Sequence, residues 1–156
     1  MSDARIVKIT LDERTVVRRN ADIEHERAVA IYDLLEENSF APIAGHPGPF
    51  HLHLAIEENR LVLDIRSVEG EPLERVMLPL APFRGIVKDY FLICESYYNA
   101  IRRATPSQIE AIDMGRRGLH NEGSELLRER LADKVSIDLN TARRLFTLLC
   151  VLHIRG

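Results

Sequence analysis

The chain has 156 residues, 46% of them hydrophobic and 29% charged, which is the balance of a globular domain and not of a disordered or fibrous chain. Its formal net charge of −3 provides no broad positive field for phosphate backbones, so nucleic acid is an unfavourable partner. No stretch reaches the roughly 18 apolar residues of a membrane span, and no basic region followed by an apolar run begins the chain. We therefore expect a single cytoplasmic domain over residues 1–156 that makes no membrane contact.

The first predicted elements are a strand and a helix. Apolar and polar residues alternate over residues 5–11, a period of two that predicts a strand. Over residues 21–38 the apolar side chains recur at helical spacing instead, which predicts an amphipathic helix. Three prolines and two glycines in residues 41–49 disfavour regular structure, so this segment is predicted to be a loop.

Three further strands are predicted after the loop. Residues 50–57 and 61–66 both alternate with period two, and Glu58-Asn59 forms a short turn between them. Residues 73–79 follow a turn that contains a glycine. Neighbouring strands joined by short turns usually pair, so an antiparallel meander with one apolar and one polar face is predicted.

The second half of the chain is predicted to be helical. Residues 83–101 carry apolar side chains at steps of three and four, and a capping box at Thr105 predicts the start of another helix. We expect that helix to be interrupted or bent around Gly115, Gly118 and Gly123, and a last, mostly buried helix to begin near Asp138 or Asn140. The fold class is therefore α+β, with an antiparallel sheet of about four strands covered on one face by four to five helices.

A pair of histidines on the first meander strand is the leading candidate site. His51 and His53 point to the same side of a strand, and a two-residue turn would place His53 across from Asp64 and His51 across from Arg66. Two imidazoles and a carboxylate can bind a divalent metal, with His46 or His120 as a further ligand. The alternative is a solvated polar sheet face, which we favour because Arg66 would repel a cation.

A glycine- and arginine-rich segment is the second candidate. Gly115, Arg116, Arg117, Gly118 and His120 could hold an anion if a helix restarts near Ser124, because free backbone amides at a helix start favour negative charge. The segment lacks the Gly-Lys-Ser/Thr of a nucleotide-binding loop. The alternative, which we favour, is that the glycines permit a close helix crossing or a kink.

Neither cysteine belongs to a catalytic or metal-binding pattern. Cys94 and Cys150 lie far apart in apolar surroundings, which is typical of small buried side chains. No nucleophile elbow of the form Gly-x-Ser-x-Gly is present in the sequence. We therefore expect no cofactor.

Three segments together carry a resemblance to a known family: HPGPFHLHL, MGRRGLHNEGSELLRERL and DLNTARRLFTLLCVLH. With them the whole chain resembles uncharacterised protein family 0262, a family of short alphaproteobacterial proteins. The resemblance implies a bacterial cytoplasmic protein. The family has no assigned activity, so the resemblance implies no functional residue.

Two functions remain open at this point. The first is an interaction or regulatory module without catalytic activity, whose partner is another protein or a second copy of the chain. The second is a metal- or anion-dependent enzyme that uses His51, His53 and Asp64. Structured-RNA binding through arginines gathered on one face is a third alternative. The absence of catalytic motifs favours the first.

Overall fold

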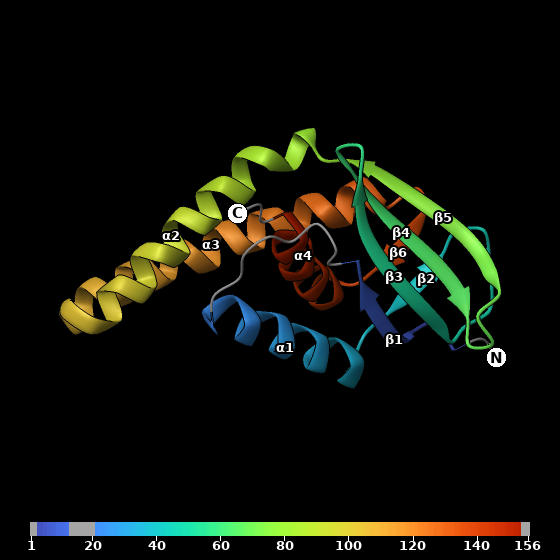
Figure 1. Cartoon of the computed structure of the whole chain (residues 1–156), viewed down its shortest axis with the longest axis horizontal. Helices are drawn as coiled ribbons and strands as arrows, with labels where there is room; N and C mark the ends of the chain where they lie inside the picture. Colours follow the sequence, from blue (N-terminus) through green and yellow to red (C-terminus); the bar gives the residue numbers. More distant parts are fainter. Residues whose placement is uncertain (1–2, 13–20, 154–156) are drawn as a thin grey trace.

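The computed structural model describes residues 3–12 and 21–153, in which a mixed β-sheet packs against a group of helices (Figure 1). In chain order the elements are β1 (Ile6–Leu11), α1 (Ala21–Glu36), β2 (Phe40–Pro42), β3 (Phe50–Glu57), β4 (Arg60–Ser67), β5 (Pro72–Pro79), a short 3₁₀ helix (Ala81–Phe83), α2 (Arg84–Arg103), α3 (Pro106–Leu131), β6 (Val135–Ile137) and α4 (Leu139–His153). The predicted α+β class is confirmed.

The larger sheet has the strand order β1-β3-β4-β5. The predicted meander is confirmed: β3, β4 and β5 pair antiparallel, and the turn between β3 and β4 places Glu58 and Asn59 at φ of 51° and 62°. These positive values are typical of a two-residue hairpin turn that matches the twist of its strands. The sheet departs from prediction at β1, which runs parallel to β3, with α1 in the connection between them.

A second, two-stranded sheet was not predicted. β2 and β6 pair antiparallel, with Phe40 opposite Ile137, so one strand falls at the start of the predicted loop and the other inside the half predicted to be helical. Both strands are three residues long, too short for an alternation pattern to reveal them. The ring of Phe40 meets that of Phe50 edge-on at 5.8 Å between centroids, which ties this small sheet to β3.

The hydrophobic core lies between one face of the larger sheet and the helices. Leu52 and Leu54 of β3 and Ile65 of β4 are almost fully buried on that face. They pack in one cluster with side chains of α4 such as Phe146 and Leu149. The prediction of a last helix buried on most sides is confirmed, because nine residues of α4 are buried. Helices thus cover one face of the sheet, as predicted.

The predicted break in the third helix is wrong. α3 runs without interruption from Pro106 to Leu131, through all three glycines. A Cβ atom on Gly115 would lie 2.7 Å from Cδ1 of Ile93 in α2, and one on Gly123 would overlap the ring of Phe146 in α4. These two glycines therefore permit close helix packing, which is the alternative that the sequence favoured.

The hairpin formed by α2 and α3 projects beyond the body of the molecule at the left of Figure 1. The predicted capping box starts α3: the Thr105 hydroxyl accepts a hydrogen bond from the Gln108 amide at 3.3 Å, and the Gln108 side chain accepts one from the Thr105 amide at 3.0 Å. The exposed tip of the hairpin is therefore fixed by local hydrogen bonds and not by packing against the body.

Candidate functional site

The predicted histidine patch exists as a polar ledge on the uncovered face of the larger sheet. We use the name ledge for Lys8, Thr10, His51, His53, Asp64 and Arg66, which line a shallow depression of about 310 Å³. β3 and β4 place His53 opposite Asp64 and His51 opposite Arg66, as the turn length predicted. β1 adds two residues to the same face, because Lys8 pairs with His51 and Thr10 with His53.

The charges of the ledge are largely satisfied within it. The Arg66 guanidinium donates two hydrogen bonds to Oδ2 of Asp64, at 3.2 and 3.1 Å, and a third to the carbonyl of Gly70 at 3.2 Å. Thr10 Oγ1 lies 2.6 Å from Nδ1 of His53. The Asp64 carboxylate is thus engaged by a cation of its own strand, which weakens the case for a metal ligand.

No group of three or more histidine, cysteine, aspartate or glutamate side chains is arranged to hold a metal ion within residues 3–12 and 21–153. His46, one proposed additional ligand, lies with Nε2 3.5 Å from Oε1 of Glu74. His120, the other, lies among the helices against the ring of Phe146. The structure therefore lends no support to the metal hypothesis for His51, His53 and Asp64.

The second candidate segment lies wholly inside α3 and has no helix start. Its backbone amides belong to a continuous helix, so they are not free to bind an anion as the prediction required. The two arginines are engaged by one carboxylate: Arg116 reaches Oδ1 of Asp113 at 2.7 Å, and Arg117 reaches Oδ2 at 3.1 Å. The Arg116 guanidinium also lies over the Tyr97 ring, 4.4 Å from its centroid. Gly118 has open space around it.

His120, the last member of that segment, packs against residues of α2 and α4. Its Nε2 lies 2.7 Å from Oγ1 of Thr147 in α4, and its ring is 5.3 Å from that of Tyr90. Burial, followed by the positive charges of Arg143, Arg116 and Arg144, lowers the pKa of His120 to about 4. The imidazole is therefore neutral at physiological pH.

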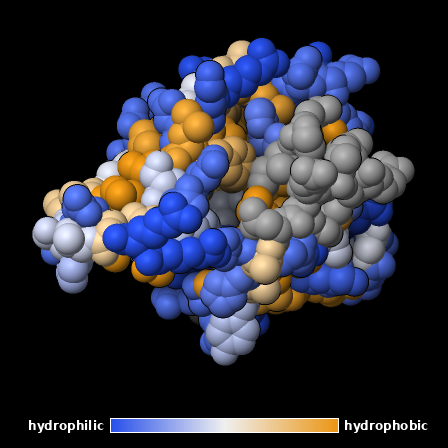
Figure 2. Space-filling view, turned by 60° about the vertical axis from the view of Figure 1, so that its left-hand side comes forward, coloured by the Kyte–Doolittle hydropathy of each residue, from blue (hydrophilic) through white to orange (hydrophobic). Residues whose placement is uncertain are grey.

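A groove along α2 has a volume of about 780 Å³. Its apolar part includes Val87, Phe91 and Leu92 of α2 and Ile23 of α1. Apolar residues gather in a band on the helical side of the molecule, bordered by hydrophilic ones (Figure 2). No pattern in the sequence indicates this groove, because it forms where residues of α1, α2 and α4 come together.

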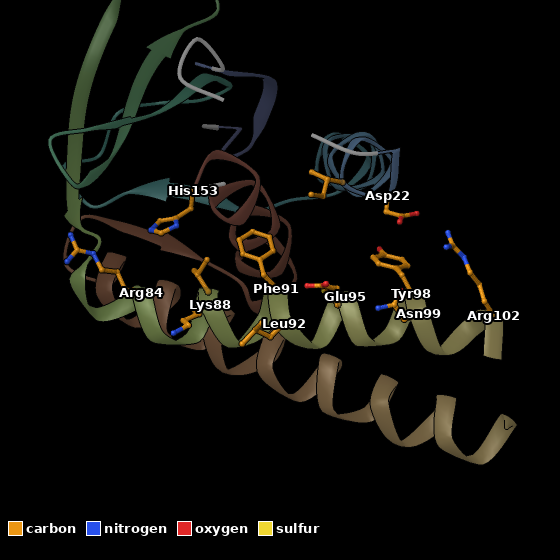
Figure 3. Close-up of a pocket in the computed structure, with 13 residues that line it drawn as sticks. Asp22, Arg84, Lys88, Phe91, Leu92, Glu95, Tyr98, Asn99, Arg102 and His153 are labelled. Carbon is orange, nitrogen blue, oxygen red and sulfur yellow. The ribbon is translucent and has the colours of Figure 1, made fainter. Parts of the chain in front are cut away.

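Charged residues stand at both ends of the groove (Figure 3). Arg84 and Lys88 lie at the end where α2 begins, beside His153 of α4. Asp22 of α1 and Arg102 lie at the other end. From Arg84 to Arg102 the helix rises about 27 Å, at 1.5 Å per residue, so the groove is long enough for a second helix.

The two cysteines are not poised for catalysis. Burial raises the pKa of Cys94 to about 11 and that of Cys150, which is fully buried, well above its usual value. A thiol nucleophile needs a lowered pKa, because the thiolate is the reactive form. Both side chains therefore serve packing around α2 and α4.

Among the described residues, none of the helices combines the length and the hydrophobicity of a membrane span.

The family model described as Uncharacterised protein family (UPF0262) matches residues 3–155. A UPF0262 protein of Paramagnetospirillum magneticum is 64% identical over 152 residues, which cover 97% of each chain. One of Rhodospirillum rubrum is 66% identical over 151 residues, covering 97% of this chain and 93% of its own. No solved structure matches the chain.

Proposed function

This chain belongs to uncharacterised protein family UPF0262, and from its surface we propose that it is a cytoplasmic interaction module without catalytic activity that pairs with a second copy of itself through α2. The observation that carries the proposal is the self-complementary charge pattern on the exposed side of that helix. The high thiol pKa values of Cys94 and Cys150 support a role other than thiol catalysis.

The contact surface is an exposed ridge on α2. We define the ridge as Arg84, Lys88, Leu92, Glu95, Asn99 and Arg102, all of which are exposed and line the groove. The spacing of three and four residues keeps them on one side of the helix. Leu92, with 55% of its surface exposed, stands at the middle of the ridge next to the half-buried ring of Phe91. Protein interfaces commonly have apolar side chains at the centre and polar or charged ones at the rim, which is the arrangement on the ridge.

An antiparallel pair of α2 helices brings opposite charges together. In a twofold pair each residue contact occurs twice, with the roles of the two copies exchanged. In an antiparallel pair, each step forward along one helix is a step backward along the other. If Phe91 of one copy faces Leu92 of the other, Lys88 therefore faces Glu95, and Arg84 faces Asn99. Two symmetric ion pairs then flank an apolar centre, and no two ridge residues of like charge face each other. The antiparallel arrangement also opposes the two helix dipoles favourably.

The competing surface is weaker. Charged side chains on this face of the sheet are already paired with one another. Arg66 of the ledge is bound to Asp64, and Arg75 on the same face is bound to Glu57 at 2.7 Å. Separating such pairs to contact a partner would cost part of their interaction. The ridge has no such obstacle, because no ion pair among residues 3–12 and 21–153 involves Lys88 or Glu95.

The test is a charge exchange measured by sedimentation equilibrium over a range of protein concentrations. Wild type is expected to dimerise. Lys88→Glu and Glu95→Lys should each raise the dimer dissociation constant at least about tenfold, because each places like charges opposite each other. The double variant Lys88→Glu/Glu95→Lys should restore dimerisation, since the pairs reform with the signs exchanged.

The matched control is Lys134→Glu, a charge reversal at an exposed residue between α3 and β6 that should leave the dissociation constant unchanged. A wild type that is monomeric at every concentration overturns the proposal. The alternative occupant of the groove is then a helix of a different protein. A dimer that survives both single reversals also overturns it, because its interface must then lie elsewhere.

A further inference from the structure

We propose that a pocket between α1 and α4 is a binding site for a small anion, a phosphate or carboxylate group held by Arg143. The pocket has a volume of about 340 Å³, at the lower end of the range found for small-molecule sites. Its walls are α1, with His25 and Asp33, and α4, with Arg143 and Thr147. His120 of α3 also lines it. The pocket shares no lining residue with the groove on α2, so the two proposals stand or fall separately.

Both acidic residues that line the pocket are already bound to other side chains of this chain. Arg144 is paired with Asp33, at 3.9 Å between Nη2 and Oδ2. The other acidic residue of the pocket, Glu26, accepts a hydrogen bond from the Tyr98 hydroxyl at 2.8 Å and lies 3.6 Å from Arg116.

Arg143 is the cation that these pairs leave out. It is only half exposed and lines the pocket, yet it forms no ion pair with any residue in the described part of the chain. A partly buried guanidinium without a carboxylate partner is suited to an external anion, because its planar fork matches the oxygens of carboxylate and phosphate groups.

Arginine charges act on the inner wall of the pocket at His120. Burial is the largest cause that lowers the pKa of His120, and the positive charges of Arg143, Arg116 and Arg144 lower it further. A bound anion would offset these arginine charges.

Apolar surface completes the site, and the Arg143 guanidinium is its donor. The Thr147 hydroxyl donates to the carbonyl of Arg143 at 3.2 Å and so accepts from His120 Nε2, which occupies both of these neutral donors within the chain. Val29 and Ala30 of α1 line the same pocket and offer contact to a short carbon skeleton. The site therefore suits a small organic acid or a phosphorylated metabolite better than a polymer.

The test uses the full chain with inorganic phosphate and with succinate, each added at constant ionic strength. Binding is followed by calorimetry and by the NMR signals of the His120 ring across pH. Saturable binding of at least one anion is expected, accompanied by a rise in the pKa of His120 because the anion offsets the arginine charges. The anion that binds more tightly identifies the head group. Arg143→Gln should raise the dissociation constant at least about tenfold, the scale of a lost hydrogen bond to a charged group.

Two further variants separate loss of the site from loss of the fold. Arg143→Lys keeps the positive charge and should retain part of the affinity. Arg103→Gln removes an exposed arginine at the hairpin tip, outside the pocket, and should bind like wild type. Absence of saturable binding by both anions overturns the proposal. Binding that Arg143→Gln leaves unchanged also overturns it.

Discussion

Gly123 of α3 and Phe146 of α4 occupy adjoining space so closely that a methyl group on Gly123 would overlap the edge of the phenylalanine ring. Phe146 is fully buried, so its ring cannot move aside without displacing the side chains packed around it. Gly123→Ala is therefore expected to lower the free energy of unfolding by about 1–3 kcal/mol, the usual cost of overpacking a core. Urea unfolding measures the difference, and an unchanged midpoint would contradict the contact between these helices.

Gly118 provides the opposite case on the same helix. A Cβ atom there would meet no atom within 4 Å. Alanine has the higher helix propensity, so Gly118→Ala should raise the free energy of unfolding by up to about 1 kcal/mol. The same urea experiment tests it. If Gly118→Ala and Gly123→Ala shifted stability in the same direction, the assignment of the two glycines to different roles would be wrong.

His120 makes the stability of the protein depend on pH. Its pKa in the folded chain is about 4, below the value near 6.5 expected when the chain is unfolded. Between these values the unfolded state binds more protons, so stability is full above about pH 6.5 and declines as the pH falls toward 4. The loss attributable to this one residue is roughly 2–3 kcal/mol.

The difference between wild type and His120→Gln, measured by unfolding at several pH values, isolates this contribution. The variant should show a shallower decline between pH 6.5 and 4, because glutamine does not titrate. Parallel profiles for the two proteins would mean that His120 is not held neutral in the folded chain.

Asn38 joins the end of α1 to β1 by three hydrogen bonds. Its side-chain oxygen accepts from the Ile6 amide at 2.7 Å, and its side-chain nitrogen donates to the carbonyls of Ile6 at 2.9 Å and Leu34 at 2.8 Å. Asn38→Ala should lower the free energy of unfolding by roughly 2–4 kcal/mol, about 1 kcal/mol for each bond. Asn121→Ala, at an exposed position of α3, serves as the control and should change it by less than about 0.5 kcal/mol.

The hairpin tip offers a local prediction. Thr105→Ala removes the hydroxyl that accepts from the Gln108 amide, which should cost about 1 kcal/mol and speed hydrogen exchange in the first turn of α3. Thr105→Ser retains the hydroxyl and should exchange like wild type. Equal exchange in all three proteins would show that the cap does not hold the tip.

The parts of the fold that follow from short stretches of sequence could be predicted. Alternation over β3 and β4, together with the two-residue turn at Glu58-Asn59, was sufficient to place His53 opposite Asp64. The parallel pairing of β1 with β3 could not be predicted, because it joins segments separated by a helix. The short strands β2 and β6 are separated in sequence by three other strands and by α2 and α3, and neither is long enough to show a pattern of its own.

The candidate sites show the same division. The ledge was predictable, since its residues lie on neighbouring strands. The glycines of α3 suggested a break, whereas their real partners, Ile93 and Phe146, belong to other helices and are invisible to a local pattern. The groove and the anion pocket depend on how α1, α2 and α4 pack, so no spacing in the sequence indicated that Arg143 would face His25 and His120 across one cavity.

The hydrogen bonds of Asn38 also determine which backbone groups are free on an edge strand of the larger sheet. Ile6, on the outermost strand at one border, has both its amide and its carbonyl occupied by an amide side chain, so it offers no free template there to a foreign strand. At the opposite border β5 begins and ends in proline and its pairing with β4 is irregular near Pro72. Pairing with a foreign strand is thereby disfavoured at Ile6 on one border and along β5 on the other.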